Sequence, residues 1–263
     1  MKINPLTDLL SDPTRGTDKS NNVLCYLFRK ALLWGRYNKH PVDFTGWNSR
    51  AKDFFEKPHN AKYKKDKGNL NKELTRPEFT WPTFKKAVDF LNPISATLTI
   101  EITRLDNTVS KHVMVIDPAE DESAVDTFGE PIDVEGTPFE GKKKPANSLA
   151  RFWRSIVIAE GITTTEKWNE KLDRYVRSPL NDMDITSLSI NDAKNTINRQ
   201  LMDNTLSWGK FRMGLNFLDY RELKFILECR WGHDPDDFNV YESGFSNPLY
   251  KLPKRNNGLK KAR

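Results

Sequence analysis

The chain has 263 residues, of which 37% are hydrophobic and 30% are charged, with 42 basic residues against 36 acidic ones. The length fits one large domain or two small ones, and the 11% of aromatic residues excludes a disordered chain, which lacks the apolar area to offset the entropy lost on ordering. The net charge of +6 favours an anionic partner such as nucleic acid, although a mixed, solvated surface has the same composition.

The N-terminal arm, residues 1–19, contains acids and prolines where a signal peptide has an apolar segment, so we expect no secretion signal. No apolar stretch reaches the roughly 18–20 residues that a membrane helix needs. The only two cysteines, Cys25 and Cys229, stand alone in apolar surroundings. We therefore expect buried thiols in a reducing compartment rather than a disulfide.

An internal repeat follows the arm. At an offset of 121, Trp47-Asn48 matches Trp168-Asn169, and further matches occur at offsets of 125 and 127. At the offset of 127 the matched first members are Asn71, Leu74, Trp81, Phe84, Phe90, Leu91 and Glu101. Because four of the seven tryptophans form two matched pairs in the same order, the pattern predicts a tandem duplication, with unit 1 at residues 20–117 and unit 2 at residues 146–250.

Each unit has the same predicted elements in chain order. In unit 1 we expect helices at residues 22–37, from Thr45, at residues 69–74 and from Trp81, followed by a hairpin at residues 98–116. The predicted core anchors of the two units are Trp47, Trp81, Phe84, Trp168, Trp208 and Phe211. The predicted fold class is α+β, with three to four helices and then a hairpin in a winged-helix-like order in each unit.

Residues 118–145 predict a linker that is acidic at its start and rich in lysine at its end, and residues 251–263 form a basic tail. Asp133, Glu140 and Lys142 have the order of the residues that metal-dependent nucleases use to hold Mg²⁺ and a hydroxide. Such residues normally lie on core strands, whereas this segment is rich in proline and glycine. We therefore expect a solvated linker and no enzyme.

Other catalytic or metal-binding patterns do not emerge. The four histidines have no zinc spacing, and the sequence contains no phosphate-binding glycine loop, so we expect no metal site and no cofactor. His112 lies within a strand pattern, and we expect it to have a structural role. Glu101 and Glu228 are a matched pair of acids on predicted strands, for which we expect structural salt bridges.

Nucleic-acid binding is one of two interpretations. In a winged helix, residues 81–91 would be the recognition helix with Lys85 and Lys86 facing outward, and the hairpin would be the wing with Lys111 near phosphates. The candidate nucleic-acid-binding residues of this interpretation are Lys62, Lys64, Lys65, Lys67, Lys85, Lys86, Lys111, Lys210 and Arg212.

The other interpretation starts from a series of motifs in unit 1. Trp47-Asn48, Gly68-Asn69-Leu70-Asn71-Lys72-Glu73-Leu74, Thr80-Trp81-Pro82-Thr83-Phe84 and Phe90-Leu91 occur in this order. This order resembles small, poorly characterised proteins of tailed bacteriophages, over most of unit 1 and more weakly over unit 2. The resemblance carries no catalytic signature, and unit 2 departs from it where Lys67-Gly68 becomes Lys194-Asn195.

The resemblance implies a bacteriophage protein in the host cytoplasm or the virion. We expect a non-enzymatic virion structural or assembly component that uses two similar units to bridge neighbours. Its partners would be proteins of a larger assembly, with DNA or RNA as the alternative and no membrane. The sequence leaves the interaction protein and the nucleic-acid-binding protein as open alternatives.

Overall fold

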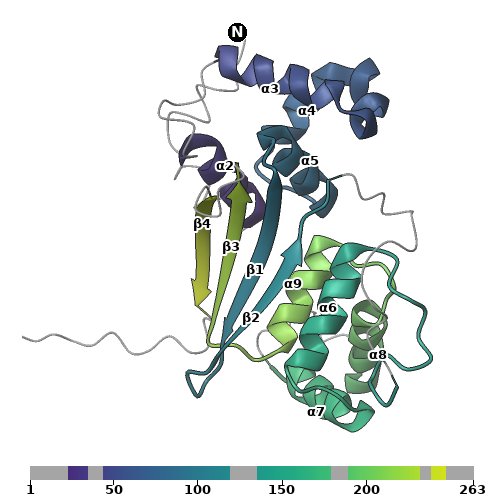
Figure 1. The fold of residues 1–263 in the computed structure, drawn as a ribbon. Coiled ribbons are helices and arrows are strands. Elements are labelled where there is room, and N and C mark those ends of the chain that lie inside the picture. Colours follow the sequence, from purple (N-terminus) through teal and green to yellow (C-terminus); the bar gives the residue numbers. More distant parts are fainter. Residues whose placement is uncertain (1–22, 35–43, 119–134, 179–188, 232–237, 247–263) are drawn as a thin grey trace, which may run out of the picture.

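The computed structural model describes residues 23–34, 44–118, 135–178, 189–231 and 238–246 (Figure 1). The first half of the chain forms α2 (Val23–Trp34), α3 (Phe44–Glu56), the 3₁₀ helix η1 (Pro58–Asp66), α4 (Lys67–Leu74), α5 (Trp81–Leu91), β1 (Ser95–Thr103) and β2 (Val109–Val115). The second half forms α6 (Ser148–Ala159), α7 (Thr165–Val176), α8 (Ile190–Leu201), α9 (Trp208–Phe217), β3 (Glu222–Arg230) and β4 (Phe238–Ser246). The α+β class is confirmed.

Local sequence signals account for several of these boundaries. The side-chain oxygen of Thr80 accepts a hydrogen bond from the N–H of Thr83 and so caps α5. In the β1–β2 turn, Asn107 has a φ of 69°, which asparagine tolerates better than most residues. Helix α8 begins at Ile190, because the side-chain oxygen of Ser189 caps it by accepting from the N–H of Asp192.

The two predicted hairpins join into one antiparallel sheet with the strand order β2-β1-β3-β4. Strands β1 and β3 are its centre, and Thr99 of β1 lies opposite Ile226 of β3. The hairpins therefore pair with each other along their full length. In the winged-helix interpretation the hairpin at residues 98–116 is the wing, whereas in the structure its strand β1 is a central strand of a sheet that both halves share.

One face of the sheet packs against helices. Leu98, Ile100 and Leu227 are buried on this face, whereas the alternating residues between them are partly exposed. On the other face, Glu101 pairs with Lys111 at 2.6 Å and Glu228 with Arg230 at 3.5 Å. The predicted structural salt bridges of the two matched acids are thus confirmed.

A helix of the first half also packs against strands of the second half. Helix α2 packs against β3 and β4, which belong to the second half, as well as against α5. Helices α3–α5 lie towards one end of the sheet and α6–α9 towards the other (Figure 1). Buried residues of both halves form one hydrophobic core, so the two halves share a sheet and a core. No helix among the described residues is long and apolar enough to span a membrane.

The predicted core anchors are all buried, and their contacts correspond between the halves. The indole N–H of Trp47 donates to Asn71 Oδ1 at 2.8 Å, and that of Trp168 donates to Asn198 Oδ1 at 2.9 Å. The Trp47 ring lies 4.6 Å from the Phe90 ring, and the Trp168 ring lies 4.7 Å from the Phe217 ring. In each half, one tryptophan therefore joins three helices through one hydrogen bond and one ring contact.

Removing either asparagine side chain is expected to destabilise the protein to a similar extent. Asn71→Ala and Asn198→Ala each leave a buried indole N–H without its acceptor, which costs about 1–3 kcal/mol. Chemical denaturation measures this change in the free energy of unfolding. The control is Asn195→Ala on the exposed side of α8, which should change the free energy by less than about 0.5 kcal/mol. Unequal losses at Asn71 and Asn198 would contradict equivalent roles.

Candidate functional site

Three of the nine predicted nucleic-acid-binding residues are paired with acids of the same chain. Lys86 lies 2.6 Å from Glu73, and Lys210 lies 2.8 Å from Asp203. Lys111 is already paired with Glu101 on the open face of the sheet. These pairs partly neutralise the cations that a phosphate backbone would contact.

Lys85 is only 5% exposed, so the expectation that it faces outward is wrong. The reason is that α5 lies among α2, α3 and α4, which bury more of its circumference than one amphipathic face. Lys62 is exposed and lies over the Tyr63 ring, and Arg212 is half-buried. The structure does not describe the side chains of Lys64, Lys65 and Lys67.

The suspected nuclease residues do not form a described cluster. Asp133 lies outside the described residues, Lys142 is exposed, and the carboxylate of Glu140 accepts from the N–H of Gly136 at 2.9 Å. The adjacent Phe139 is buried, and its ring lies 6.0 Å from that of Trp168. The expectation of a solvated linker is therefore wrong at Phe139, which belongs to the core. Within the described ranges, no group of three or more His, Cys, Asp or Glu residues could hold a metal ion.

The carboxylate of Glu160 ties the second half to the first. Glu160 follows α6, and Arg104 donates to its Oε2 from Nε at 3.0 Å and from Nη2 at 2.7 Å. On the other oxygen, Oε1 lies 2.8 Å from His112 Nε2 and accepts from the hydroxyl of Ser110. The side chains of Glu160 and His112 are both buried, and the histidine ring is directed at the carboxylate. We assign the cluster a structural role, as the sequence predicts for His112.

A groove of about 720 Å³ lies where the two halves meet. It is lined by residues 76–82 of the first half and by residues 205–209 of the second, together with Asn147. At the offset of 127, residues 78–82 match residues 205–209, so the two halves contribute the same part of their sequence. A groove of this volume falls in the range of roughly 300–1,000 Å³ that ligand sites occupy.

Two stacked indoles are among the residues that line this groove. The rings of Trp81 and Trp208 lie 6.4 Å apart with an angle of 15° between their planes. Thr80 and Ser207 cap the helices that begin with these tryptophans, so both helix N-termini, with their partial positive charge, are at the groove. Around the buried rings, the exposed lining residues include Arg76, Pro77, Glu78, Thr80, Pro82, Thr205, Ser207 and Gly209. The groove therefore has an apolar floor and a polar rim with one cation and one anion.

The two indoles differ in their hydrogen bonds. The N–H of Trp81 donates to the hydroxyl of Ser148 at 3.0 Å, whereas the N–H of Trp208 is buried and has no hydrogen-bond partner in the described structure. At the offset of 125, Val23 takes the place of Ser148, and valine has no acceptor. The two indole N–H groups thus differ in hydrogen bonding where the sequence has serine at position 148 and valine at the matched position 23.

Sequence reasoning predicted both tryptophans as core anchors and missed the groove between them. A groove shared by segments more than 120 residues apart depends on how the halves pack, which local patterns do not contain. Comparison with protein-family models, curated proteins and solved structures finds no match for this chain.

Proposed function

We propose that the chain is a non-enzymatic interaction protein of bacteriophage type, a virion structural or assembly component built from two diverged copies of one unit. The equivalent hydrogen bonds of Trp47 and Trp168 and the matched caps at Thr80 and Ser207 support the duplication. Two copies held rigidly in one sheet would present related surfaces in two directions, which suits a protein that bridges neighbours.

The observation that carries the proposal is the groove between the halves. Its partner is a segment of a neighbouring protein that lies in the groove between residues 76–82 and residues 205–209. Aromatic residues and arginine are enriched among the residues that dominate protein–protein binding, and the groove has both. Its rim balances Arg76 with Glu78, which favours a peptide over a polyanion.

Nucleic-acid binding remains the alternative, motivated by the net charge of +6. The pairing of Lys86, Lys111 and Lys210 with acids disfavours it. A titration with random-sequence DNA and RNA at increasing salt separates the two, because phosphate contacts release counterions. We expect no micromolar binding at physiological salt. Micromolar binding that weakens steeply with salt would replace our proposal by this alternative.

Site-specific photo-cross-linking tests the groove directly. A benzoylphenylalanine at Gly209 or Thr205 is introduced into the full chain during particle assembly, with Glu170 on α7 as the exposed control position. A Cβ at Gly209 would come no closer than 3.9 Å to a neighbouring atom, so a side chain can be attached at this position without a clash at its Cβ. We expect one protein adduct from both groove positions and none from Glu170. Adducts with nucleic acid, or equal adducts from all three positions, would contradict the proposal.

A further inference from the structure

The sheet ends in two edge strands, β2 and β4, which correspond to each other between the halves. The strand registers give this correspondence, because the matched acids Glu101 and Glu228 lie opposite Lys111 and Val240 respectively. An edge strand directs part of its backbone N–H and C=O groups away from the sheet, where a further strand can pair with them. Proteins normally block such edges with charged side chains, prolines, bulges or covering segments.

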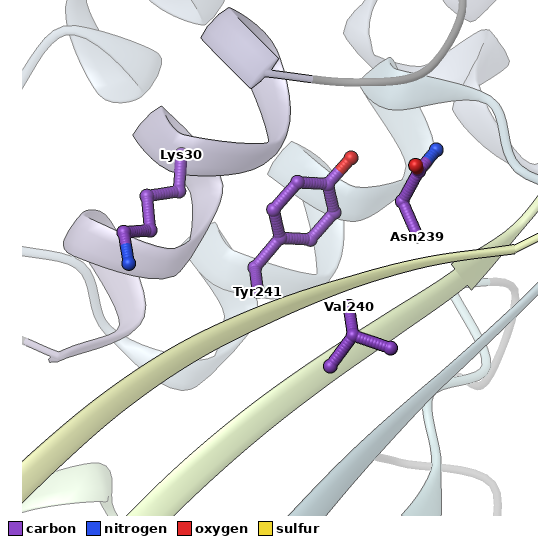
Figure 2. Close-up of a pocket in the computed structure, with 4 residues that line it drawn as sticks. All are labelled: Lys30, Asn239, Val240 and Tyr241. Atoms are coloured by element: carbon purple, nitrogen blue, oxygen red, sulfur yellow. The ribbon is translucent and has the colours of Figure 1, made fainter.

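Lys30 of α2 covers part of the edge of β4. Its ammonium donates to the backbone oxygen of Glu242 at 3.0 Å, so this carbonyl already has a partner. Together with residues 239–241, Lys30 lines a cavity of about 350 Å³ between α2 and β4. Figure 2 shows Lys30 and Tyr241 on one side of β4 and Val240 on the opposite side. The helix side of this edge is thus occupied by the chain itself.

The backbone groups that β2 directs outward follow from the hydrogen bonds at the two ends of its hairpin. The N–H of Ile116 donates to the oxygen of Ala96, and the N–H of Arg104 donates to the oxygen of Thr108. Both continue the register of β1 with β2, in which hydrogen-bonded pairs alternate with pairs that exchange no hydrogen bond. The outward N–H and C=O groups of β2 therefore belong to Val109, Lys111, Val113 and Val115.

The described part of the chain leaves this edge of β2 open. On its outer side, the backbone groups of these four residues have no hydrogen-bond partner among the described residues. The valines at positions 109, 113 and 115 are 53%, 61% and 62% exposed. At the offset of 125, the counterpart of Lys30 is Ser155, whose hydroxyl donates to a backbone oxygen of its own helix. Helix α6 therefore has no lysine at the position from which Lys30 covers β4.

Lys111 is the charged residue of this edge. A lysine on an edge strand normally keeps the strands of two molecules apart, because its charge repels and remains hydrated. The ammonium of Lys111 lies 2.6 Å from a carboxylate oxygen of Glu101 on the neighbouring strand. This pairing offsets the charge within the chain and weakens the repulsion between two copies of the edge.

We infer that β2 pairs in antiparallel orientation with β2 of a second copy of this chain, so that their two four-stranded sheets form one continuous sheet. An edge that pairs with itself across a two-fold axis is self-complementary, because both copies present the same row of donors and acceptors. One register pairs all four outward residues, with position 109 opposite 115 and position 111 opposite 113 of the second copy. Valines then lie side by side on the open face, where β-branched pairs stabilise a sheet. This surface goes beyond the groove and does not depend on it.

Sedimentation velocity of the full chain over a concentration series tests the inference. We expect a monomer–dimer equilibrium with a Kd of about 1–100 μM, because a pair of seven-residue strands forms a small interface. Val113→Lys places an uncompensated charge on the edge and should raise the Kd at least tenfold. Because Val113 is exposed, the variant should keep the Tm that the wild type has at a concentration where it is monomeric.

Val240→Lys is the matched control on the other edge. Val240 is 44% exposed and corresponds to Lys111, so the sheet already has a lysine at the equivalent position of its first half. We expect the Kd of the wild type, because the pairing edge is β2. Equal weakening of the dimer by Val113→Lys and Val240→Lys would overturn the inference, since added charge anywhere on the sheet would then explain both.

Two single-cysteine variants test the register. Val109→Cys and Val115→Cys proteins are mixed and treated with a thiol cross-linker shorter than about 10 Å, which spans residues on paired strands. The native Cys25 and Cys229 are buried. Two copies of the same position would lie about 20 Å apart, because six residues of strand separate them. We therefore expect cross-linked dimers from the mixture and none from either variant alone.

A wild type that stays monomeric at about 100 μM would overturn the inference and leave the edge of β2 to a strand of another protein. Equal cross-linking in the mixture and in the separate variants would contradict the antiparallel register. Both results are independent of the groove, since neither the edge of β2 nor the altered valines line it.

Discussion

Replacing Gly214 with valine is expected to destabilise the protein by about 3 kcal/mol, because overfilling a packed core forces side chains and backbone apart. A Cβ at position 214 on α9 would lie 2.9–3.0 Å from ring atoms of Trp153 on α6. The Trp153 ring is fully buried and is held by a hydrogen bond from its N–H to the Leu201 oxygen at 3.0 Å, so it has no free space to move into. Thermal unfolding should show a fall in Tm of roughly 6–12 °C.

Gly209 on the same helix is the matched control. A Cβ at position 209 meets nothing closer than the Ser207 hydroxyl at 3.9 Å, and the residue does not need a positive φ. Gly209→Ala should therefore leave stability unchanged or raise it by up to about 1 kcal/mol, because alanine loses less conformational entropy on folding. Equal destabilisation by both substitutions would contradict the contact with Trp153 as the cause, because a side chain at position 209 makes no such contact.

The second large effect is expected at Glu160. Glu160→Ala removes a buried carboxylate that Arg104, Ser110 and His112 share, and breaking such an ion pair from one side costs about 3–5 kcal/mol. Because these partners lie on the first half and Glu160 on the second, the loss should appear in the global free energy of unfolding. A loss below about 1 kcal/mol would contradict the structural role of the cluster.

The same carboxylate makes stability depend on pH. Burial alone would raise the pKa of Glu160, but hydrogen bonds from His112 and Ser110 and the charge of Arg104 outweigh it and lower the pKa. Its stabilisation is thus fully present above the ordinary carboxyl pKa of about 4.3 and is lost as the pH falls through the lower folded value. Free energies of unfolding between pH 7 and pH 3 should fall less steeply in Glu160→Gln than in the wild type. An unchanged slope would contradict this origin.

The sequence predicts local structure well where the signal lies within one segment. The cap at Thr80, the helix from Trp81 and the alternation of Leu98, Ile100 and Ile102 all depend on neighbouring residues, and the structure has each of them. The pairing of β1 with β3 joins residues 119 to 135 positions apart, and no local pattern encodes it. The exposure of Lys85 was predicted wrongly for the same reason, because helices on several sides of α5 bury it.

The same distinction between local sequence signals and long-range packing applies to the candidate sites. Trp81 and Trp208 could be predicted as buried anchors, but their stacking across the groove depends on how the halves meet. Glu160 offered a weak signal, because an acidic residue at a helix C-terminus opposes the helix dipole and needs a compensating cation. The buried hydroxyl of Tyr241, which has no hydrogen-bond partner in the described structure, could not be predicted, because its hydrogen bonding depends on all the elements that pack around it.

The shared sheet is the central claim, because the groove where the two halves meet depends on it. Hydrogen–deuterium exchange of the full chain tests it by comparing the wild type with Gly214→Val, whose altered residue lies only in the second half. If β1 and β3 are central strands of one sheet, the amides of both strands should lose protection together and by the same free energy. Loss of protection in β3 with β1 unchanged would show that the halves fold separately and would contradict the account.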